Sequence, residues 1–388
     1  MSALQEKDKA FVAGTYARFP VEILRGEGSK VWDGDGKCYT DLGSGIAVTS
    51  FGIADAEWQK AVVEQLGKVQ HTSNLYYTEP CALLAEMLCE KTGFKKVFFG
   101  NSGAEANECA IKVARKYAAE KKGPEFHTVV TLVNSFHGRT LTTLAATGQE
   151  HYHELFQPLT PGFVHTPAND LAALERTVAE HKVAGILLEC VQGEGGVIAL
   201  DAAFVRGVAE LCAREDIVFM VDEVQTGNGR TGELYAYMHY GVIPDVVTTA
   251  KGLGGGLPIG ACMLGEKVQG VLGFGDHGST FGGNPVACAG ACSILSRLDD
   301  AMLADVREKS AYIFETLKGA KGVKSVSGLG LMIGIECEKP AAQVVKECIE
   351  RGVLCLTAKD KVRLLPALNI PLEELKTAIE TLCAVLAQ

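Results

Sequence analysis

Short, continuous apolar runs recur along the middle of the chain and predict strands that are buried on both faces of a sheet. A strand with one face in water would alternate apolar and polar residues, whereas continuous runs are typical of a mostly parallel sheet. The runs lie at Val97–Phe99, Val129–Val133, Ile186–Leu188, Ile217–Val221, Val246–Val247 and Ile259–Leu264.

Between these runs, apolar residues return at every third or fourth position, which predicts helices. Ala106, Ala110 and Val113 follow this spacing, and the segments Asn169–His181 and Asp201–Arg214 have a similar pattern. Strands that alternate with helices indicate an α/β domain with crossover connections.

The two ends of the chain have a different pattern. After Asn284, helices dominate up to a short strand pair near Val323–Glu336 and a final helix from Pro371. Near the start, Val31–Asp33 and Cys38–Asp41 flank a Gly-Asp-Gly turn and predict a hairpin, which we expect to join the C-terminal part. We therefore expect an N-terminal segment joining a small domain, a large domain, and the small domain itself, at residues 1–50, 51–284 and 285–388.

Composition narrows the class of protein. At 388 residues the chain is too long for one compact core, and 47% apolar with 22% charged residues is ordinary for a globular enzyme. The net charge of -10 argues against a protein that binds nucleic acid or anionic membranes. The charged first residues do not resemble a secretory signal, and no apolar stretch approaches membrane-spanning length.

The thirteen cysteines predict neither a disulfide framework nor a metal site. Their number is odd, no Cys-x-x-Cys occurs, and some, such as Cys190 and Cys262, lie inside apolar runs. We expect unpaired thiols in a reducing cytoplasm. The fragment His151–His153 has no evident third ligand, so we expect no metal there.

Reactive side chains follow five of the predicted strands. Ligands of open parallel sheets bind beyond the carboxyl ends of the strands, so these side chains should meet at one rim. In chain order they are Ser102, then His137 and Arg139, then Glu189 and Glu194, then Asp222 and Gln225, and finally Lys251.

Each of these residues also has a plainer interpretation. Ser102 and Glu105 form either a simple capping box or the start of a helix that binds phosphate. Asp222 is either a helix cap, a metal ligand or the partner of a pyridinium N–H. Lys251 precedes a glycine-rich stretch and is either a solvated lysine or a partly desolvated nucleophile.

The two candidate anion-binding arginines also have a functional and a structural interpretation. Arg139 and Arg363 could bind carboxylates through both guanidinium nitrogens, or they could form surface ion pairs. His137 could be a ligand or a base, although a lone histidine is usually structural.

Six motifs together resemble the class III (ornithine/GABA-type) aminotransferases of PLP fold type I, in order and spacing along nearly the whole chain. This resemblance implies a pyridoxal 5′-phosphate (PLP) enzyme with a large domain, in which helices flank a mostly parallel seven-stranded sheet, and a smaller α+β domain. The motifs are Asn101–Glu108, Phe136–Thr140, Gln192–Gly196, Asp222–Gly227, Lys251–Gly252 and Gly278–Pro285.

The resemblance also implies a role for single residues. Lys251 would hold PLP as a Schiff base and move the substrate proton, while Asp222 would pair with the pyridine nitrogen. Gln225 would approach the phenolic oxygen and Phe136 would stack on the ring. The phosphate would be held by Ser102, Gly103 and Ala104, and by Thr280 of the neighbouring subunit in a homodimer with shared active sites.

Substrate binding follows from the same resemblance. Arg139 and Arg363 would bind carboxylates, with Ser279 beside them, and Glu194 would cover Arg363 until 2-oxoglutarate arrives. The chain is most similar to members that use N2-acetyl-L-ornithine as the amino donor in arginine biosynthesis, because of Gly45–Val48 and the segment around His71. Ornithine, succinylornithine and GABA are the alternative donors.

The chain departs from the family pattern at one segment, and two other classes of protein are weighed against the aminotransferase interpretation. The family often has a Gly-His-x-His-Pro-like stretch where this chain reads Gly52–Glu57, with neither His nor Pro, so we expect a different entrance wall. A PLP racemase or aminomutase would share the fold without using two alternating substrates. A nucleotide-binding protein has only the glycines of Gly328–Gly334 in its favour, and their spacing does not fit.

Overall fold

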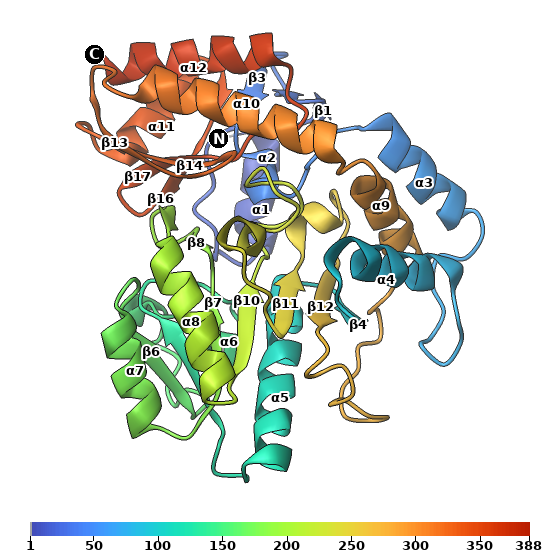
Figure 1. Ribbon diagram of the computed structural model, residues 1–388. Helices are drawn as coiled ribbons and strands as arrows, with labels where there is room; N and C mark the ends of the chain where they lie inside the picture. The colour runs from blue at the N-terminus through green and yellow to red at the C-terminus, as the bar shows by residue number, and fades with distance from the viewer. Residues whose placement is uncertain (1) are drawn as a thin grey trace.

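The computed structural model describes residues 2–388, and its larger part is built on a seven-stranded sheet in the lower half of Figure 1. Its strands are β4 (Lys96–Gly100), β5 (Thr128–Leu132), β6 (Phe163–Thr166), β7 (Val183–Leu188), β10 (Val218–Asp222), β11 (Val246–Thr249) and β12 (Gly260–Leu264). They lie in the order β4-β12-β11-β10-β7-β5-β6. β12 is antiparallel to both neighbours and all other pairs are parallel. The expected mostly parallel seven-stranded sheet is confirmed.

Helices cover both faces of this sheet, which explains why the strands are continuously apolar. In β10, Met220 packs in the same cluster as residues of α5 (Gly103–Lys121). Its neighbour Phe219 points the other way and packs with α7 (Leu171–Glu180) and α8 (Ala202–Arg214). A strand enclosed in this way has no solvent face to carry polar residues. α7 and α8 begin and end close to where the apolar spacing predicts them.

A second group of helices packs beside β4, at the right of Figure 1. It consists of α3 (Ala56–Leu66), α4 (Glu79–Thr92) and α9 (Pro285–Ser296), and α9 contacts both of the others. The short α6 (Leu141–Ala146) lies against α5 and β6.

The upper part of Figure 1 contains two smaller sheets. One has the order β1-β2-β3-β15, from β1 (Arg25–Glu27), β2 (Lys30–Trp32), β3 (Cys38–Asp41) and β15 (Val353–Leu354). The other has the order β13-β14-β17-β16, from β13 (Val323–Leu329), β14 (Met332–Cys337), β16 (Leu356–Ala358) and β17 (Lys361–Leu364). The helices of this part are α10 (Asp300–Leu317), α11 (Ala341–Glu350) and α12 (Leu372–Leu386).

The first of these sheets joins the two ends of the chain. β3 of the N-terminal hairpin pairs parallel with β15, with Thr40 opposite Val353. The domain boundaries expected at residues 50 and 284 stay a prediction.

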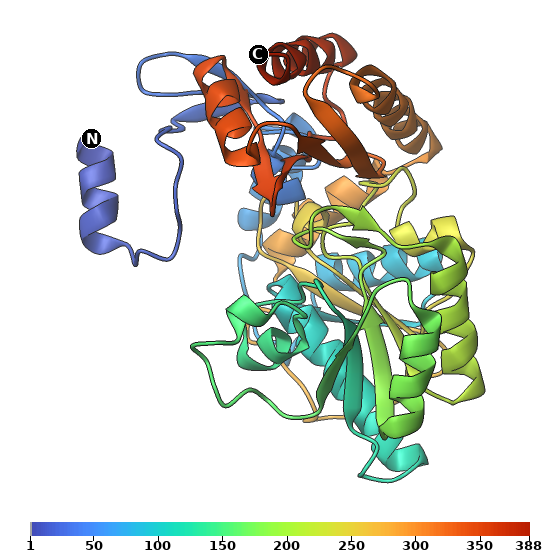
Figure 2. The ribbon, with the colours of Figure 1, turned by 90° about the vertical axis from the view of Figure 1, so that its left-hand side faces the viewer.

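The N-terminal helix α1 (Ala3–Phe11) stands apart from the rest of the chain, and an extended segment connects it to β1 (Figure 2). Ser2 caps the helix, and none of its side chains is buried. Phe11 is therefore left in solvent.

Within residues 2–388, no helix has both the length and the apolar character needed to cross a membrane. The same residues include no cluster of three or more His, Cys, Asp or Glu side chains suited to a metal ion. All thirteen cysteines are free thiols.

Candidate active site

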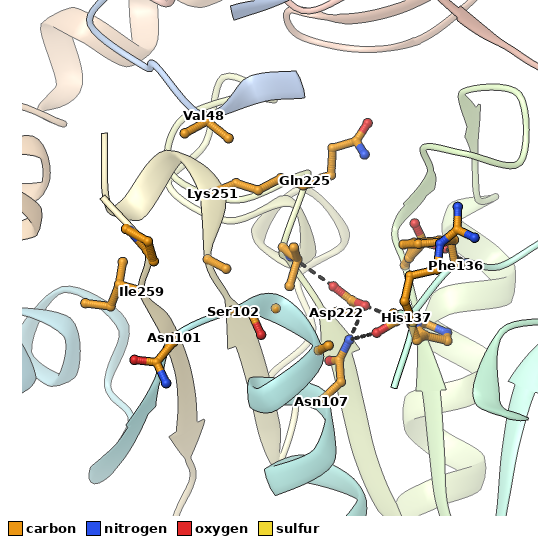
Figure 3. Close-up of a pocket in the computed structure, with 18 of the residues that line it drawn as sticks. Val48, Asn101, Ser102, Asn107, Phe136, His137, Asp222, Gln225, Lys251 and Ile259 are labelled. Atoms are coloured by element: carbon orange, nitrogen blue, oxygen red, sulfur yellow. Dashed lines mark hydrogen bonds and ion pairs between the residues drawn. The ribbon is translucent and has the colours of Figure 1, made fainter. Parts of the chain in front are cut away.

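A cavity of about 430 Å³ lies at the carboxyl ends of the parallel strands. The loops after β4, β5, β7, β10 and β11 all contribute to its lining, as the positions of the reactive residues predict. Figure 3 shows the labelled side chains facing this common space. The predicted site residues that line it are Ser102, Gly103, Ala104, Phe136, Arg139, Glu189, Asp222, Gln225 and Lys251.

The N-terminus of α5 provides free N–H groups at one end of the cavity. The Ser102 hydroxyl caps the helix by accepting from the backbone N–H of Glu105 at 3.2 Å. The N–H groups of Gly103 and Ala104 lie in the first turn, where a helix has no acceptor of its own for them. A helix end with free N–H groups and a positive dipole suits a phosphate, so the capping and phosphate interpretations of this motif are compatible.

Asp222 is held in one orientation by donors that line the same cavity. Its Oδ2 accepts from Asn107 Nδ2 at 2.7 Å and lies 2.8 Å from His137 Nδ1, and its Oδ1 accepts from the Val224 N–H at 3.0 Å (Figure 3). Thr248 donates to Asn107 Oδ1 at 2.6 Å and so fixes which way that amide points. The carboxylate is only 4% exposed, and these bonds compensate for its loss of water.

Sequence reasoning missed two members of this network. The sequence assigned His137 no definite role, since a ligand, a base and a structural histidine were all open. It contacts Asp222, and its buried Nε2 has no partner within residues 2–388. Asn107 lies one helical turn after Gly103, a spacing that places both on the same side of α5 and could have revealed it. Further lining residues without a predicted role are Val48, Val224, Leu257, Pro258 and Ile259.

Lys251 begins the short helix η3 (Lys251–Leu253) directly after β11 and has a positive φ of 45°. Such a conformation costs a non-glycine residue about 1–3 kcal/mol and is often found at functional sites. Burial lowers the pKa of the Lys251 amine from its usual 10.5, although the charge of Glu194 opposes the shift. The amine is therefore more readily neutral than that of a solvated lysine.

Glu189 connects two loops of the site. Its Oε2 accepts from the Phe136 N–H at 2.9 Å and its Oε1 from the Gly193 N–H at 3.3 Å. Burial raises the pKa of the Glu189 carboxyl well above its usual 4.5, and the charge of Asp222 adds to the effect. Glu189 thus ties the loop that carries Phe136 to the turn that carries Glu194.

Glu194 and Arg363, predicted to be partners, are in contact. Arg363 Nη1, on β17, lies 2.6 Å from Glu194 Oε1. Gln225 bonds to both, at 3.2 Å to Arg363 and 3.3 Å to Glu194. Burial alone would raise the pKa of the Glu194 carboxyl, but the adjacent guanidinium outweighs it, so the pKa is lowered from 4.5.

Arg139 is held differently. Its guanidinium lies over the ring of Tyr152 at 4.3 Å and over that of Phe136 at 5.5 Å. It is exposed and lines the cavity, and no acidic side chain of residues 2–388 pairs with it. Its positive charge is therefore available to a ligand.

Four predicted residues do not line this cavity. Glu194 and Arg363 contact its lining through Gln225. Thr280 is exposed on the surface loop before α9, and neighbouring Ser279 accepts a hydrogen bond from Asn101 Nδ2 at 3.0 Å. A single chain does not bring Thr280 to its own phosphate-binding helix end.

A left-handed turn forms part of the cavity wall. Ser44, Gly45, Ile46 and Ala47 have consecutive positive φ angles of 40°, 64°, 62° and 61°. The Ser44 hydroxyl donates to the Leu365 carbonyl at 2.5 Å and anchors the turn. The turn places Val48 in the lining, above Lys251 in Figure 3.

The entrance segment that lacks the family's His and Pro is stabilised by other contacts. Asp55 caps α3 and pairs with Arg297 at 2.8 Å. Trp58 Nε1 donates to the Gly254 carbonyl at 3.0 Å, beside the loop that follows Lys251. The glycine loop is thus supported by an indole in this chain.

The chemistry of the lining fits PLP group by group. A lysine amine suits its aldehyde, a buried carboxylate its pyridinium nitrogen, a helix N-terminus its phosphate and an aromatic ring its flat face. A seven-stranded sheet with this set of groups at its carboxyl edge defines a PLP-dependent enzyme of fold type I.

Comparison with known proteins defines the family. Residues 11–386 match the model of the family Aminotransferase class-III, and the chain belongs to this family of PLP-dependent aminotransferases. The predicted family, fold, cofactor and type of reaction are therefore confirmed.

Three similar proteins carry three different substrate names. An acetylornithine aminotransferase of Haemophilus ducreyi is 51% identical, covering 99% of this chain and 98% of its own length. A succinylornithine transaminase of Citrobacter koseri is 44% identical, over 98% and 96%. A solved ornithine aminotransferase of Toxoplasma gondii, with PLP in part of its active sites, has a TM-score of 0.95 at 32% identity, over 99% and 94%.

Proposed function

We propose that this aminotransferase transfers the δ-amine of N2-acetyl-L-ornithine to 2-oxoglutarate, giving N-acetyl-L-glutamate 5-semialdehyde and L-glutamate in arginine biosynthesis. The observation that carries the proposal is a pair of arginines at one site. Arg139 lines the cavity without an acidic partner, and Arg363, paired with Glu194, contacts the cavity-lining Gln225. The acetylornithine aminotransferases among the relatives support this choice of donor.

When bound, PLP supplies an electron sink for the carbanion that transamination requires. Lys251 Nζ takes the proton from the substrate carbon that bears the amine, a task suited to an amine whose pKa burial has lowered. Asp222 would pair with the ring nitrogen, Phe136 would stack on the ring and Gln225 would approach the phenolic oxygen. The first turn of α5, at Ser102, Gly103 and Ala104, would hold the phosphate by hydrogen bonds.

The two arginines let one cavity accept two different substrates in turn. The amino donor has one carboxylate, which Arg139 binds, while Glu194 neutralises Arg363. 2-Oxoglutarate has two carboxylates, and its second one replaces Glu194 on Arg363. Because Gln225 bonds to both partners of the pair, it can stay with either after they separate. Ser279, on the nearby surface loop, completes the substrate side.

We place the complete active site in a homodimer, with Thr280 donating to the phosphate of the neighbouring subunit. Large apolar side chains are exposed on the same surface, with Tyr77 fully exposed, Tyr76 70% and Phe281 58% exposed. Asn74 Nδ2 donates to the carbonyls of Ser279 and Gly282 and so joins this surface to the Thr280 loop. The free thiols favour a reducing compartment, the cytoplasm.

The test is an absorbance spectrum of the purified protein, with Lys251→Ala alongside. The yellow band of the cofactor should bleach with N2-acetylornithine and return with 2-oxoglutarate, and Lys251→Ala should not turn over. A yellow protein that ignores this donor would contradict the substrate and leave the family intact. Failure to form glutamate from 2-oxoglutarate would favour a racemase or aminomutase.

Competition between donors tests the acyl group. Values of kcat/KM for N2-acetylornithine, N2-succinylornithine, ornithine and GABA should be highest for the acetylated donor. A preference of more than about tenfold, equivalent to 1.4 kcal/mol, for any other donor would overturn the assignment.

A further inference from the structure

We propose that Tyr152 is a positioning residue that aims the Arg139 guanidinium at the substrate carboxylate. This inference rests on the proposed role of Arg139. Tyr152 ends the short helix η1 (Glu150–Tyr152), in the segment between α6 and β6.

Three side chains form a compact cluster at this point. The Arg139 guanidinium carbon lies 4.3 Å from the centroid of the Tyr152 ring and 5.5 Å from that of Phe136. The two rings meet edge to face, with centroids 5.8 Å apart and planes at 71°. The guanidinium is therefore in contact with two aromatic rings, and only one of them, Phe136, already has a role in holding the cofactor.

An exposed arginine without such contacts would sample many rotamers and would lose that freedom on binding a carboxylate. Ring faces attract the guanidinium and restrict it, yet they leave its charge and its N–H groups free for a ligand. An acidic partner would restrict it as well, but the substrate would then have to displace that acid. The two arginines are thus restricted in two different ways. An acidic partner, Glu194, holds Arg363, and aromatic rings hold Arg139.

The contact depends on the ring of Tyr152 and not on its hydroxyl. Within residues 2–388 the Tyr152 hydroxyl makes no hydrogen bond to another side chain or to the backbone. The His151 ring lies next to the Tyr152 ring, with centroids 3.9 Å apart and planes at 41°. Phenylalanine should therefore replace Tyr152, and an aliphatic residue should not.

The experiment uses the holoenzyme and compares Tyr152→Leu with Tyr152→Phe. Glutarate, a dicarboxylate with neither an amine nor a keto group, is titrated by calorimetry, and KM is measured for the donor and for 2-oxoglutarate. Tyr152→Leu should weaken glutarate binding and raise both KM values about threefold to fivefold, with kcat within about twofold of the wild type. Tyr152→Phe should restore all three values.

Matched variants exclude an indirect effect on folding. Phe156 is another half-exposed aromatic residue of the same segment and does not contact Arg139, so Phe156→Leu should leave glutarate binding unchanged. In an Arg139→Met background, Tyr152→Leu should have no further effect on glutarate binding, because the residue it positions is gone. If Tyr152→Leu does not fold, Tyr152→Met offers a larger ring-free side chain for the same comparison.

Three results would overturn the inference. They are unchanged glutarate affinity in Tyr152→Leu, equal losses in the Leu and Phe variants, and a further loss in the Arg139→Met background. The test does not depend on the identity of the donor, because glutarate binding needs no reaction. A different preferred donor would contradict the proposed substrate and leave the comparison of Tyr152 variants valid.

Discussion

Burial changes the chemistry of single side chains at this site. Lys251 loses water and with it part of its preference for the charged form, while Glu189 is shifted toward its neutral form by the same loss. Asp222 is equally enclosed, but donors from Asn107, His137 and Val224 surround it. What each residue can do is decided by the groups that it contacts, several of which also line the cavity.

The lowered pKa of Lys251 predicts a pH-dependent stability in the cofactor-free protein. Between the folded pKa and 10.5, the folded chain holds fewer protons than the unfolded chain, so this group's contribution to stability rises with pH. Below the folded pKa the Lys251 amine is charged in both states, so its burial destabilises the folded chain by the full amount. Lys251→Met should therefore stabilise the protein most near neutral pH, and the gain should shrink toward pH 10.5. Denaturant unfolding across this range measures it, and a gain that grows with pH would contradict the burial argument.

Asn107 donates a hydrogen bond to Asp222, and an effect through that carboxylate predicts a selective loss of rate. Asn107→Ala removes its hydrogen bonds to Asp222 and to the His137 carbonyl and leaves the Thr248 hydroxyl without its acceptor. A hydrogen bond to a charged group contributes about 1.5–3 kcal/mol, so kcat should fall by about tenfold to a hundredfold. Steady-state kinetics should show KM for 2-oxoglutarate nearly unchanged, and a change confined to KM would exclude this role.

At the scale of elements, the sequence predicts the strands of the large sheet and the reactive residues at its carboxyl edge. It does not predict the hydrogen bonds that orient these residues. The strands of the large sheet could be read from continuous apolar runs because helices enclose both faces, and the reactive residues could be placed because parallel strands share one carboxyl edge. The bonds from Asp222 to Asn107 and His137 could not, because they join residues 115 and 85 positions apart. The left-handed turn could not either, because only Gly45 among its four residues favours that conformation.

The approach of β12 to the start of α5 predicts a cost for any side chain at Gly260. A Cβ there would lie 2.1 Å from the Ser102 carbonyl oxygen, so the backbone at the start of α5, the proposed phosphate site, would have to move. Gly260→Ala should lower the free energy of unfolding by about 1–3 kcal/mol and weaken retention of PLP. Gly270 has open space around its Cα, so Gly270→Ala should change stability by less than about 0.5 kcal/mol. Equal effects of the two variants in thermal unfolding and cofactor release would refute the packing argument.

At the scale of the whole molecule, the exposed surface around the Thr280 loop is the part that a single chain leaves unexplained. The side chains of Tyr77 and Phe281 are exposed to solvent, although burial of large aromatic side chains stabilises most folds. The same surface carries the one predicted phosphate ligand that is missing from the cavity. A second copy of the chain would account for both observations.

A charge placed on this surface should separate the subunits. Tyr77→Asp combined with Phe281→Asp should convert a dimer into a monomer, because two carboxylates would be buried without partners. Sedimentation velocity should show half the wild-type mass, and retention of PLP should fall because Thr280 no longer reaches the second site. Ile243→Asp is the control, since Ile243 is 85% exposed in the segment before β11 and not in the loop of Thr280. A double variant that stays dimeric would place the interface elsewhere.

The left-handed turn at Ser44–Ala47 has a consequence for engineering the enzyme. Each non-glycine residue in that conformation costs about 1–2 kcal/mol, and Ile46, which is 40% exposed, recovers little of it through burial. Ile46→Gly is therefore a natural first step toward a more heat-resistant catalyst. The relief has a limit, because a looser turn would no longer fix Val48 in the lining of the cavity, so the gain in melting temperature and the loss in turnover should grow together.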